Sequence, residues 1–128
     1  MPDTLLGSIV INEILVDPNG APNFDTGVSG TANSADEYIE LYNTAGAAIN
    51  IGGLQLWDAG VSLWFTFPVG TIATNAPAMV MSGVQTGGAL PTGDPGDLFF
   101  DAGRGSSLIN NSGDNVTLLY SSGAGSFI

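Results

Sequence analysis

Two short stretches near the start of the chain constrain its fold more than any other feature. Residues 9–16 and 36–43 are rich in β-branched and aromatic residues, and each carries a carboxylate where a strand would pack apolar side chains. The first stretch runs into Asp17-Pro18-Asn19-Gly20, where proline fixes φ and glycine accepts a positive φ. The pattern predicts strands joined by tight turns.

Similar short apolar segments recur along the rest of the chain, and none has the 3.6-residue period of a helix. The chain is therefore expected to be all-β, a sandwich or barrel. Continuous apolarity on both faces of the first strand predicts a central or doubly covered strand, with Glu13 on the face of Ile9, Ile11 and Leu15. Polar loops are expected at 17–35 and 83–96. The expected strands are 8–16, 37–43, 53–58, 62–67, 78–82, 97–100 and 115–120.

The length of 128 residues suits one domain with a single core. We expect this domain to span residues 1–128, with a lead-in at 1–7 and a truncated or partial final strand at 121–128. The chain has no cysteine, which excludes a disulfide framework and thiol chemistry.

The charge is strongly one-sided. Twelve acidic residues face one basic residue, Arg104, and the chain has no histidine, giving a net charge of −11. Such a surface repels phosphate backbones and anionic lipids, so we expect binding neither to nucleic acid nor to a membrane surface. Membrane insertion is not expected either, because no apolar run reaches the roughly 18 residues that span a bilayer. The carboxylates must be solvated, hydrogen-bonded to backbone N–H groups or neutralised by a metal ion. Arg104 itself is expected to pair with a local acid or to bind carbonyl oxygens.

Several blocks, in this order, resemble the lamin tail domain in its bacterial form. The match runs from about residue 9 to residue 120, which makes it more specific than any single motif. The last two blocks resemble the family's "TFP-x-G-T-x-I" and "L-x-N-x-G-D-x-V-x-L" patterns. The blocks are Ile11-Asn12-Glu13-Ile14, Glu37-Tyr38-Ile39-Glu40-Leu41-Tyr42-Asn43, Ile51-Gly52-Gly53-Leu54-Gln55-Leu56-Trp57-Asp58, Phe65-Thr66-Phe67-Pro68-Val69-Gly70-Thr71-Ile72 and Asn110-Asn111-Ser112-Gly113-Asp114-Asn115-Val116-Thr117-Leu118.

The resemblance implies an immunoglobulin-like β-sandwich of Greek-key type with about seven to nine short strands. It also implies a non-catalytic interaction module of a secreted or cell-surface protein in bacteria or archaea. Two features depart from the family: the loop at 17–35 is long, and the usual closing strand is cut short at Ser126-Phe127-Ile128. An incomplete edge strand invites pairing with another chain, so a homodimer through edge strands is one expectation.

Three glutamates, Glu13, Glu37 and Glu40, allow two interpretations. Two carboxylates could serve as the acid and base of a glycosidase, with Glu13 paired to Glu37 or Glu40. Alternatively, the carboxylates tie strands and loops to backbone N–H groups. Because the chain lacks His, Lys and Cys as further catalytic groups, and because the resembled family is non-catalytic, we favour the structural role.

The first polar loop and its flanks form the better candidate site. Oxygen ligands from carboxylates, amides and carbonyls suit Ca²⁺, although the spacing is not that of an EF-hand. The alternative is a loop whose acids cap turns. No cofactor beyond possible calcium is expected. The candidate ligands are Asp17, Asn19, Asp25, Asp36 and Glu37, with Asn23 nearby.

Two tryptophans are candidate contacts for a partner. Trp64 and Phe65 are consecutive, so strict alternation sends their side chains to opposite faces. We expect Trp57 and Phe65 or Phe67 to point inward and Trp64 to lie at the surface or under a loop, where it could contact a sugar or a protein.

The resulting functional hypothesis is a non-enzymatic, adhesion-type interaction module of an extracellular or cell-surface protein, with a protein or glycan partner. The alternative is a calcium-dependent carbohydrate-binding module appended to an extracellular enzyme. Trp64 and Trp57 are the residues expected to contact the partner in either case.

Overall fold

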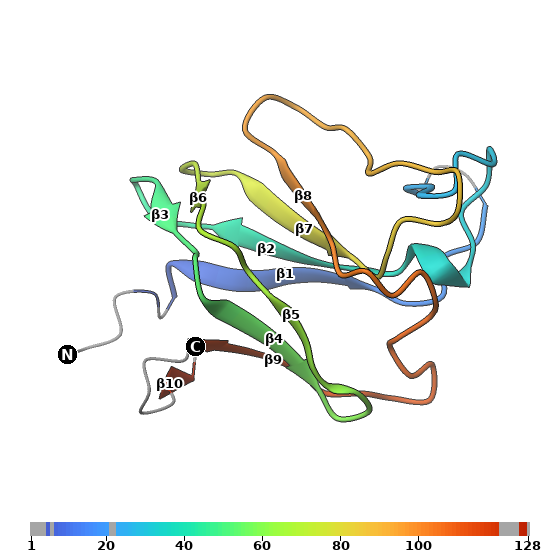
Figure 1. The fold of residues 1–128 in the computed structure, drawn as a ribbon. Helices are drawn as coiled ribbons and strands as arrows, with labels where there is room; N and C mark the ends of the chain where they lie inside the picture. Colours follow the sequence, from blue (N-terminus) through green and yellow to red (C-terminus); the bar gives the residue numbers. More distant parts are fainter. Residues whose placement is uncertain (1–4, 6, 21–22, 121–125, 128) are drawn as a thin grey trace.

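A computed structural model describes residues 5, 7–20, 23–120 and 126–127, which form two packed β-sheets (Figure 1). The predicted all-β fold is confirmed. In the described part of the chain the one helical element is a three-residue 3-10 helix, and no helix there is long and apolar enough to cross a membrane. The elements are β1 (Ile9–Leu15), η1 (Ser34–Asp36), β2 (Tyr38–Asn43), β3 (Ile49–Asn50), β4 (Leu54–Asp58), β5 (Ser62–Thr66), β6 (Thr71–Ile72), β7 (Pro77–Met81), β8 (Leu98–Asp101), β9 (Val116–Tyr120) and β10 (Ser126–Phe127).

Each main sheet has four strands. The first sheet has the order β1-β2-β7-β8, antiparallel except for the parallel pair β7–β8, and the second has the order β10-β9-β4-β5, antiparallel throughout. The seven predicted strands correspond to β1, β2, β4, β5, β7, β8 and β9. The additional pair β3–β6 was not predicted because strands of two residues are too short to show a period.

The main core lies between the two sheets. Alternate residues of β2, β4 and β7, such as Ile39, Leu56 and Val80, are fully enclosed there. The rings of Phe65, Phe67 and Phe100 meet with centroids 4.9–5.7 Å apart, two of the three pairs edge to face. This cluster joins β5 and the residue that follows it to β8 across the sandwich.

β1 is an edge strand, so the prediction of a central or doubly covered strand is wrong. A β-bulge at Asn12 interrupts its pairing with β2: Ile11 pairs with Leu41, and Glu13 pairs with Glu40. The extra residue reverses the alternation, because two residues of β1 oppose one of β2. Glu13 is therefore exposed on the outer face and does not share the inward face of Ile9.

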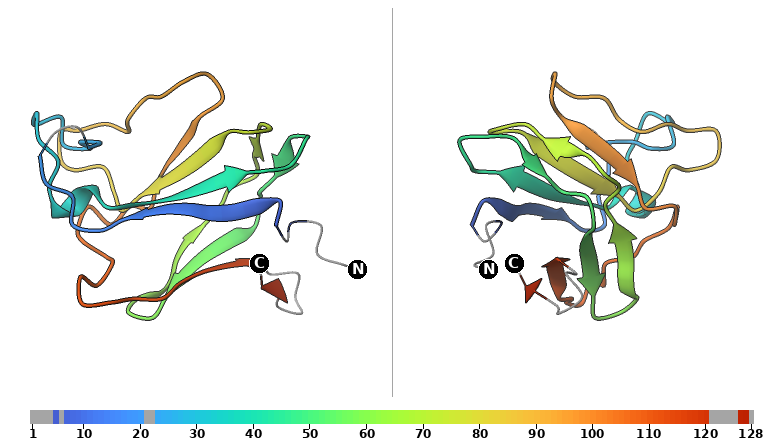
Figure 2. Two further views of the ribbon diagram at one scale, coloured as in Figure 1. Left: turned by 180° about the vertical axis from the view of Figure 1, so that it is seen from behind. Right: turned by 60° about the vertical axis from the view of Figure 1, so that its left-hand side comes forward.

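The outer face of the first sheet carries a second, smaller core. Tyr38, Met79 and Met81 are its buried members. Two side chains from the long connections cover them: Phe24 from the segment between β1 and β2, and Leu90 from the segment between β7 and β8. Figure 2 shows these two segments beside the first sheet. Each of the two loops that were predicted to be polar thus contributes one apolar side chain to this second core.

Among the described residues, none covers the outer face of the second sheet in this way. Its outward side chains follow from the strand pairing, and none of them belongs to either core cluster. Leu63 is 37% exposed, and β10 pairs only with Leu119 and Tyr120 of β9. The predictions for residues 1–4, 6, 121–125 and 128 lie outside the described residues. The outward residues are Gln55, Trp57, Leu63, Thr66, Thr117 and Leu119.

Candidate functional site

Three connections meet at one end of the sandwich, which we call the loop end: residues 16–37, 82–88 and 102–115. In Figure 1 they lie at the right, opposite the end at which β1 begins and β9 stops. The predicted calcium ligands belong to this end. Two consecutive carboxylates, Asp36 and Glu37, organise it, and both side chains are 0% exposed.

Glu37 ties two of these connections to the start of β2. Its Oε1 accepts hydrogen bonds from the Asp17 N–H (3.3 Å) and the Ser107 hydroxyl (2.8 Å). Its Oε2 accepts from the N–H groups of Leu108 (2.6 Å) and Ile109 (2.8 Å). Both oxygens are used in full, as a buried carboxylate without a cation requires. The structural interpretation of Glu37 therefore has direct support in these contacts, and its complete burial separates it from any substrate.

Asp36 plays the same part for the other connection. Its Oδ1 accepts from the Thr26 N–H (2.7 Å), the Thr26 hydroxyl (2.6 Å) and the Gln85 side-chain amide (3.0 Å). Its Oδ2 accepts from the N–H of Asn33 (2.8 Å), which is the N-cap of η1 in a capping box. Asp36 thus joins the first long loop to the segment after β7.

These two loops pack against each other without room for added atoms. The Ala89 N–H donates to the Thr26 carbonyl oxygen (3.1 Å). A Cβ at Gly88 would lie 1.7 Å from that same carbonyl oxygen. Glycine is required at position 88 because the two backbones approach so closely.

The tip of the first loop is an ordered turn around Asp25. The carboxylate accepts from the N–H groups of Gly27 (2.9 Å) and Gly30 (2.7 Å) and from the Ser29 hydroxyl (3.4 Å). Desolvation would raise the pKa of Asp25, but hydrogen bonds from Gly30, Gly27 and Ser29 outweigh it and lower that pKa. Val28, at the centre of the turn, has φ of +53° and is 69% exposed.

The remaining candidate ligands do not join one set of oxygens. The Asp17 carboxylate accepts from the Asn111 side chain (3.1 Å), Asn23 donates to the Gly20 carbonyl (3.2 Å), and Asn19 is exposed. Within the described residues, no group of three or more His, Cys, Asp or Glu side chains is arranged to hold a metal ion. The calcium site stays a prediction.

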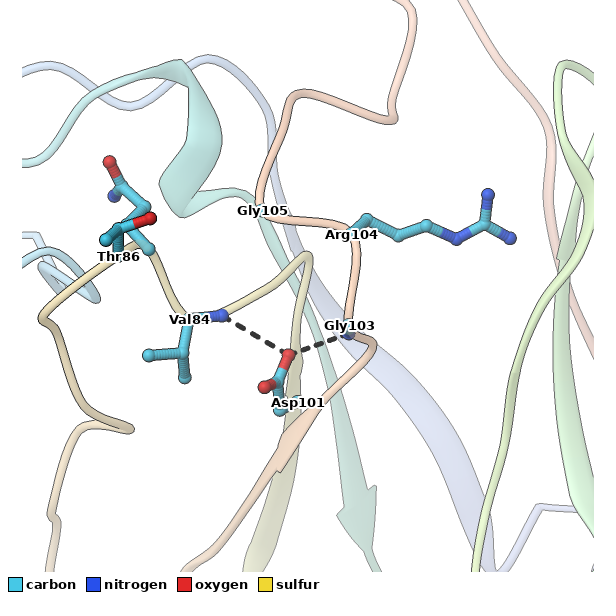
Figure 3. Close-up of a pocket in the computed structure, with 7 residues that line it drawn as sticks. Val84, Thr86, Asp101, Gly103, Arg104 and Gly105 are labelled. Atoms are coloured by element: carbon cyan, nitrogen blue, oxygen red, sulfur yellow. Dashed lines mark hydrogen bonds between the residues drawn. The ribbon is translucent and has the colours of Figure 1, made fainter.

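An open hollow of about 630 Å³ adjoins the loop end (Figure 3). Asp101 closes one side, accepting from the N–H groups of Val84 (3.2 Å) and Gly103 (2.7 Å). The Arg104 side chain extends away from Asp101, and its guanidinium donates to the Leu63 carbonyl (3.5 Å). The hollow therefore contains no ion pair between Asp101 and Arg104. It is lined by Val84, Gln85, Thr86, Asp101, Gly103, Arg104 and Gly105.

Glu13 and Glu40 are brought together on the outer face of the first sheet. They are direct cross-strand partners, Asn12 donates to Glu40 (2.6 Å), and the Tyr38 hydroxyl donates to Glu13 (2.8 Å). Burial and the bond to Glu13 raise the pKa of Tyr38 strongly, so it stays a hydrogen-bond donor. These contacts fix the strand edge, as expected for a structural role.

The expected orientation of the tryptophans is wrong for both residues. Trp64 is 5% exposed and lies in the main core, while Phe65 packs against the same core. A β-bulge explains this: Leu56 pairs with Phe65 and Trp57 with Leu63, so Trp64 is the extra residue. Two consecutive side chains of a bulged strand can face the same side. The Trp64 indole N–H has no hydrogen-bond partner among the described residues.

Trp57 occupies the outer face of the second sheet. It is half-buried, lies between its cross-strand partners Leu63 and Thr117, and belongs to neither core cluster. Its indole N–H donates to the Gln55 side-chain oxygen (3.0 Å), which fixes the orientation of the ring. Of the two predicted contact residues, Trp57 is the one that the fold presents on an uncovered surface.

Sequence reasoning missed several residues that shape these surfaces. Phe24 had a recognisable signal, since a large aromatic residue inside a Gly- and Asn-rich loop indicates a buried anchor. Gln85 and Leu90 had none, because their partners are more than forty residues away in sequence or on another strand. The positive φ of Val28 also had no signal, since β-branched residues rarely adopt it.

The two packed β-sheets, with buried Asp36 and Glu37 holding the connections at one end, are consistent with an immunoglobulin-like β-sandwich. The Lamin Tail Domain family model matches residues 3–125. The chain belongs to the Lamin Tail Domain family, a non-enzymatic family of immunoglobulin-like domains, which confirms the resemblance and the fold expected from it. A search of curated proteins found no match.

Proposed function

We propose that this chain is a non-catalytic, adhesion-type module of a secreted or cell-surface prokaryotic protein, and that the loop end binds a protein partner. The observation that carries the proposal is Val28, an apolar side chain 69% exposed at the tip of an ordered turn. Asp25 holds the turn, and Asp36 holds the loop below it through Thr26. A rigid loop loses little entropy on binding, so one presented apolar side chain is used efficiently.

Photo-crosslinking on intact cells of the source organism tests this proposal. A photoreactive amino acid replaces Val28 in one variant and Val69, which is 91% exposed at the turn between β5 and β6, in the control. A defined protein adduct at position 28 and none at position 69 is expected. Equal adducts at both positions, or none at either, would contradict a protein site at the loop end.

The alternative function is a calcium-dependent carbohydrate-binding module appended to an extracellular enzyme. Twelve acidic residues with one arginine favour a bound cation, and Trp57 favours a glycan. A ligand that binds only the folded state raises the free energy of unfolding, by about 2.7 kcal/mol at a hundredfold excess over Kd, and therefore raises the melting temperature. Melting with millimolar Ca²⁺ and then with excess chelator is the test, and identical curves would remove the calcium.

Edge pairing between two copies is the remaining proposal for a partner. β10 covers Leu119 and Tyr120 of β9 only, and β9 carries no charged side chain. Thr117→Glu and Thr117→Lys should each be monomeric and should associate when mixed, because like charges oppose pairing and unlike charges favour it. The same changes at Thr66, on the opposite edge strand of that sheet, are the control. A sedimentation mass unchanged by mixing would exclude the dimer.

A further inference from the structure

We infer that the outer face of the second sheet is a binding platform for a neutral polysaccharide, with Trp57 as its stacking residue. The inference deepens the carbohydrate-binding alternative and rests on it, but it requires neither calcium nor the loop end. The platform consists of the outward residues of β4, β5 and β9 already defined: Gln55, Trp57, Leu63, Thr66, Thr117 and Leu119.

The first argument is the geometry around the indole. Trp57 lies on the middle strand of this face, and the Gln55 side chain accepts its N–H at 3.0 Å, which leaves the orientation of the ring fixed. A pyranose has a face of C–H groups, and these carry a small positive charge that is attracted to the π-face of an aromatic ring. A fixed ring on a sheet is a pre-organised stacking partner for such a face.

The second argument is the chemistry of the surrounding side chains. Thr66 and Thr117 each supply a hydroxyl that both donates and accepts hydrogen bonds, and the Gln55 amide nitrogen supplies further donors. Sugar hydroxyl groups have the same dual character. The platform therefore offers an apolar centre with polar groups beside it, which is the composition of sites that bind small polar ligands.

The third argument is charge. None of the six platform residues is ionised at neutral pH, although the chain carries a net charge of −11. The net charge already includes the one cation, Arg104, whose guanidinium lies at the Leu63 carbonyl, so an anionic polysaccharide would still meet the repulsive field of the whole domain. The ligand class that this surface fits is a neutral glycan.

The fourth argument is size, which decides between a glycan and a protein. Three strands of five residues make a face of roughly 17 Å by 14 Å, from about 3.4 Å per residue and 4.8 Å between strands. A stable protein interface needs about 800 Å² on each partner, several times this area. A short run of sugar rings needs no more than the platform provides.

Native gel electrophoresis in soluble polysaccharides tests the inference. The neutral probes are hydroxyethylcellulose, xylan and galactomannan, and the anionic probes are alginate and polygalacturonate. At least one neutral probe should retard the protein, neither anionic probe should, and chelator should change nothing. Trp57→Ala should weaken the retarded complex about tenfold or more. Val69→Ala, at an exposed position outside the platform, should change it less than about twofold.

Two further variants serve as controls, one for misfolding and one for whether the probe binds at Trp57. Thr117→Arg adds bulk and charge at the platform without removing the indole, and it should also abolish retardation while the circular dichroism spectrum is unchanged. Trp64→Phe leaves Trp57 as the sole indole, and its emission should shift to shorter wavelength when the neutral probe binds. If a neutral probe retards the Trp64→Phe variant but leaves its tryptophan emission spectrum unchanged, the assignment of Trp57 as the stacking residue is wrong.

The outcomes separate the site from the function. Retardation that survives both Trp57→Ala and Thr117→Arg leaves carbohydrate binding intact and refutes this platform. No retardation by any neutral probe refutes the platform and the carbohydrate alternative together. If Trp57→Ala lowers binding of a protein partner to the domain and no polysaccharide binds, the platform is a protein contact and the inference is wrong.

Discussion

The outer faces of the two sheets differ in whether loop side chains cover them. The first sheet buries Tyr38, Met79 and Met81 under two long loops, and two buried carboxylates lock the loop end beside it. The second sheet has an outer face with Trp57 on its middle strand, and no cluster of the described residues lies over it. The difference teaches that the long polar loops of this chain cover the outer face of one sheet, whereas the outer face of the other is formed by strand residues alone among the described residues.

The largest expected effect comes from breaking the anchor of the loop end. Glu37→Gln keeps the shape of the side chain but turns an N–H₂ group toward N–H or O–H donors. Leaving buried donors unsatisfied should lower the free energy of unfolding by about 2–4 kcal/mol. Urea denaturation measures it. Glu40→Gln, where only Asn12 donates to the carboxylate, is the control and should cost less than about 0.5 kcal/mol.

Uncovering the first sheet is the next largest change. The Phe24 ring meets Tyr38 at 5.5 Å and Phe99 at 5.4 Å, edge to face. Phe24→Ala should cost about 2–3 kcal/mol and speed amide exchange in the first long loop. Leu63→Ala on the uncovered sheet should cost below about 1 kcal/mol. Equal losses for the two variants would mean that the covered and uncovered faces do not differ in packing.

Val28→Gly should have the opposite sign. Valine at φ of +53° is strained, and glycine removes the strain at some cost in unfolded-state entropy. A gain of up to about 1 kcal/mol in unfolding free energy is expected. Val28→Gly should also bind more weakly to the protein that cross-links at position 28, because it lacks the apolar side chain. A loss of stability would show that the turn is not strained.

The smallest effect is a pH dependence at the turn before β9. N–H groups of Asn110 and Asn115, with a smaller contribution from Ala59, lower the pKa of Asp114 below 3.8 and outweigh desolvation. A lowered pKa in the folded state stabilises the fold above 3.8, and this stabilisation is lost as the pH falls through the folded value. Melting curves of Asp114→Asn should therefore approach those of the wild type in acid. A difference in melting temperature that stays constant from neutral pH into acid would contradict this.

The long strands could be predicted because their signals are local. Alternation and β-branched residues locate β2, β4 and β9 within one or two residues, and Pro68 marks the end of β5. The two-residue strands β3 and β6 could not be predicted, since their pairing depends on residues that are distant in sequence.

The two β-bulges, in β1 and β5, are where the sequence predicted the wrong side-chain orientation. At Asn12 and at Trp64, one extra residue reverses which side chains face the core, and no local sequence pattern predicts this reversal. Glu13 was consequently placed inward and Trp64 outward, whereas Trp57 faces outward by the regular alternation of β4, in which Leu54, Leu56 and Asp58 are buried. Bulge positions depend on the register with a partner strand, so they are decided only when the sheet forms.

The sequence by itself determined the class of fold, the family and the need for the carboxylates to find partners without cations. Period-two apolar patterning and a charge of −11 are properties of the chain alone. The tertiary structure decided which acids are buried, which sheet face is covered and which tryptophan is presented. Glu37 is saturated by donors about seventy residues away, and Trp64 turns into the core because of a bulge in the pairing of β5 with β4; no local pattern encodes either arrangement.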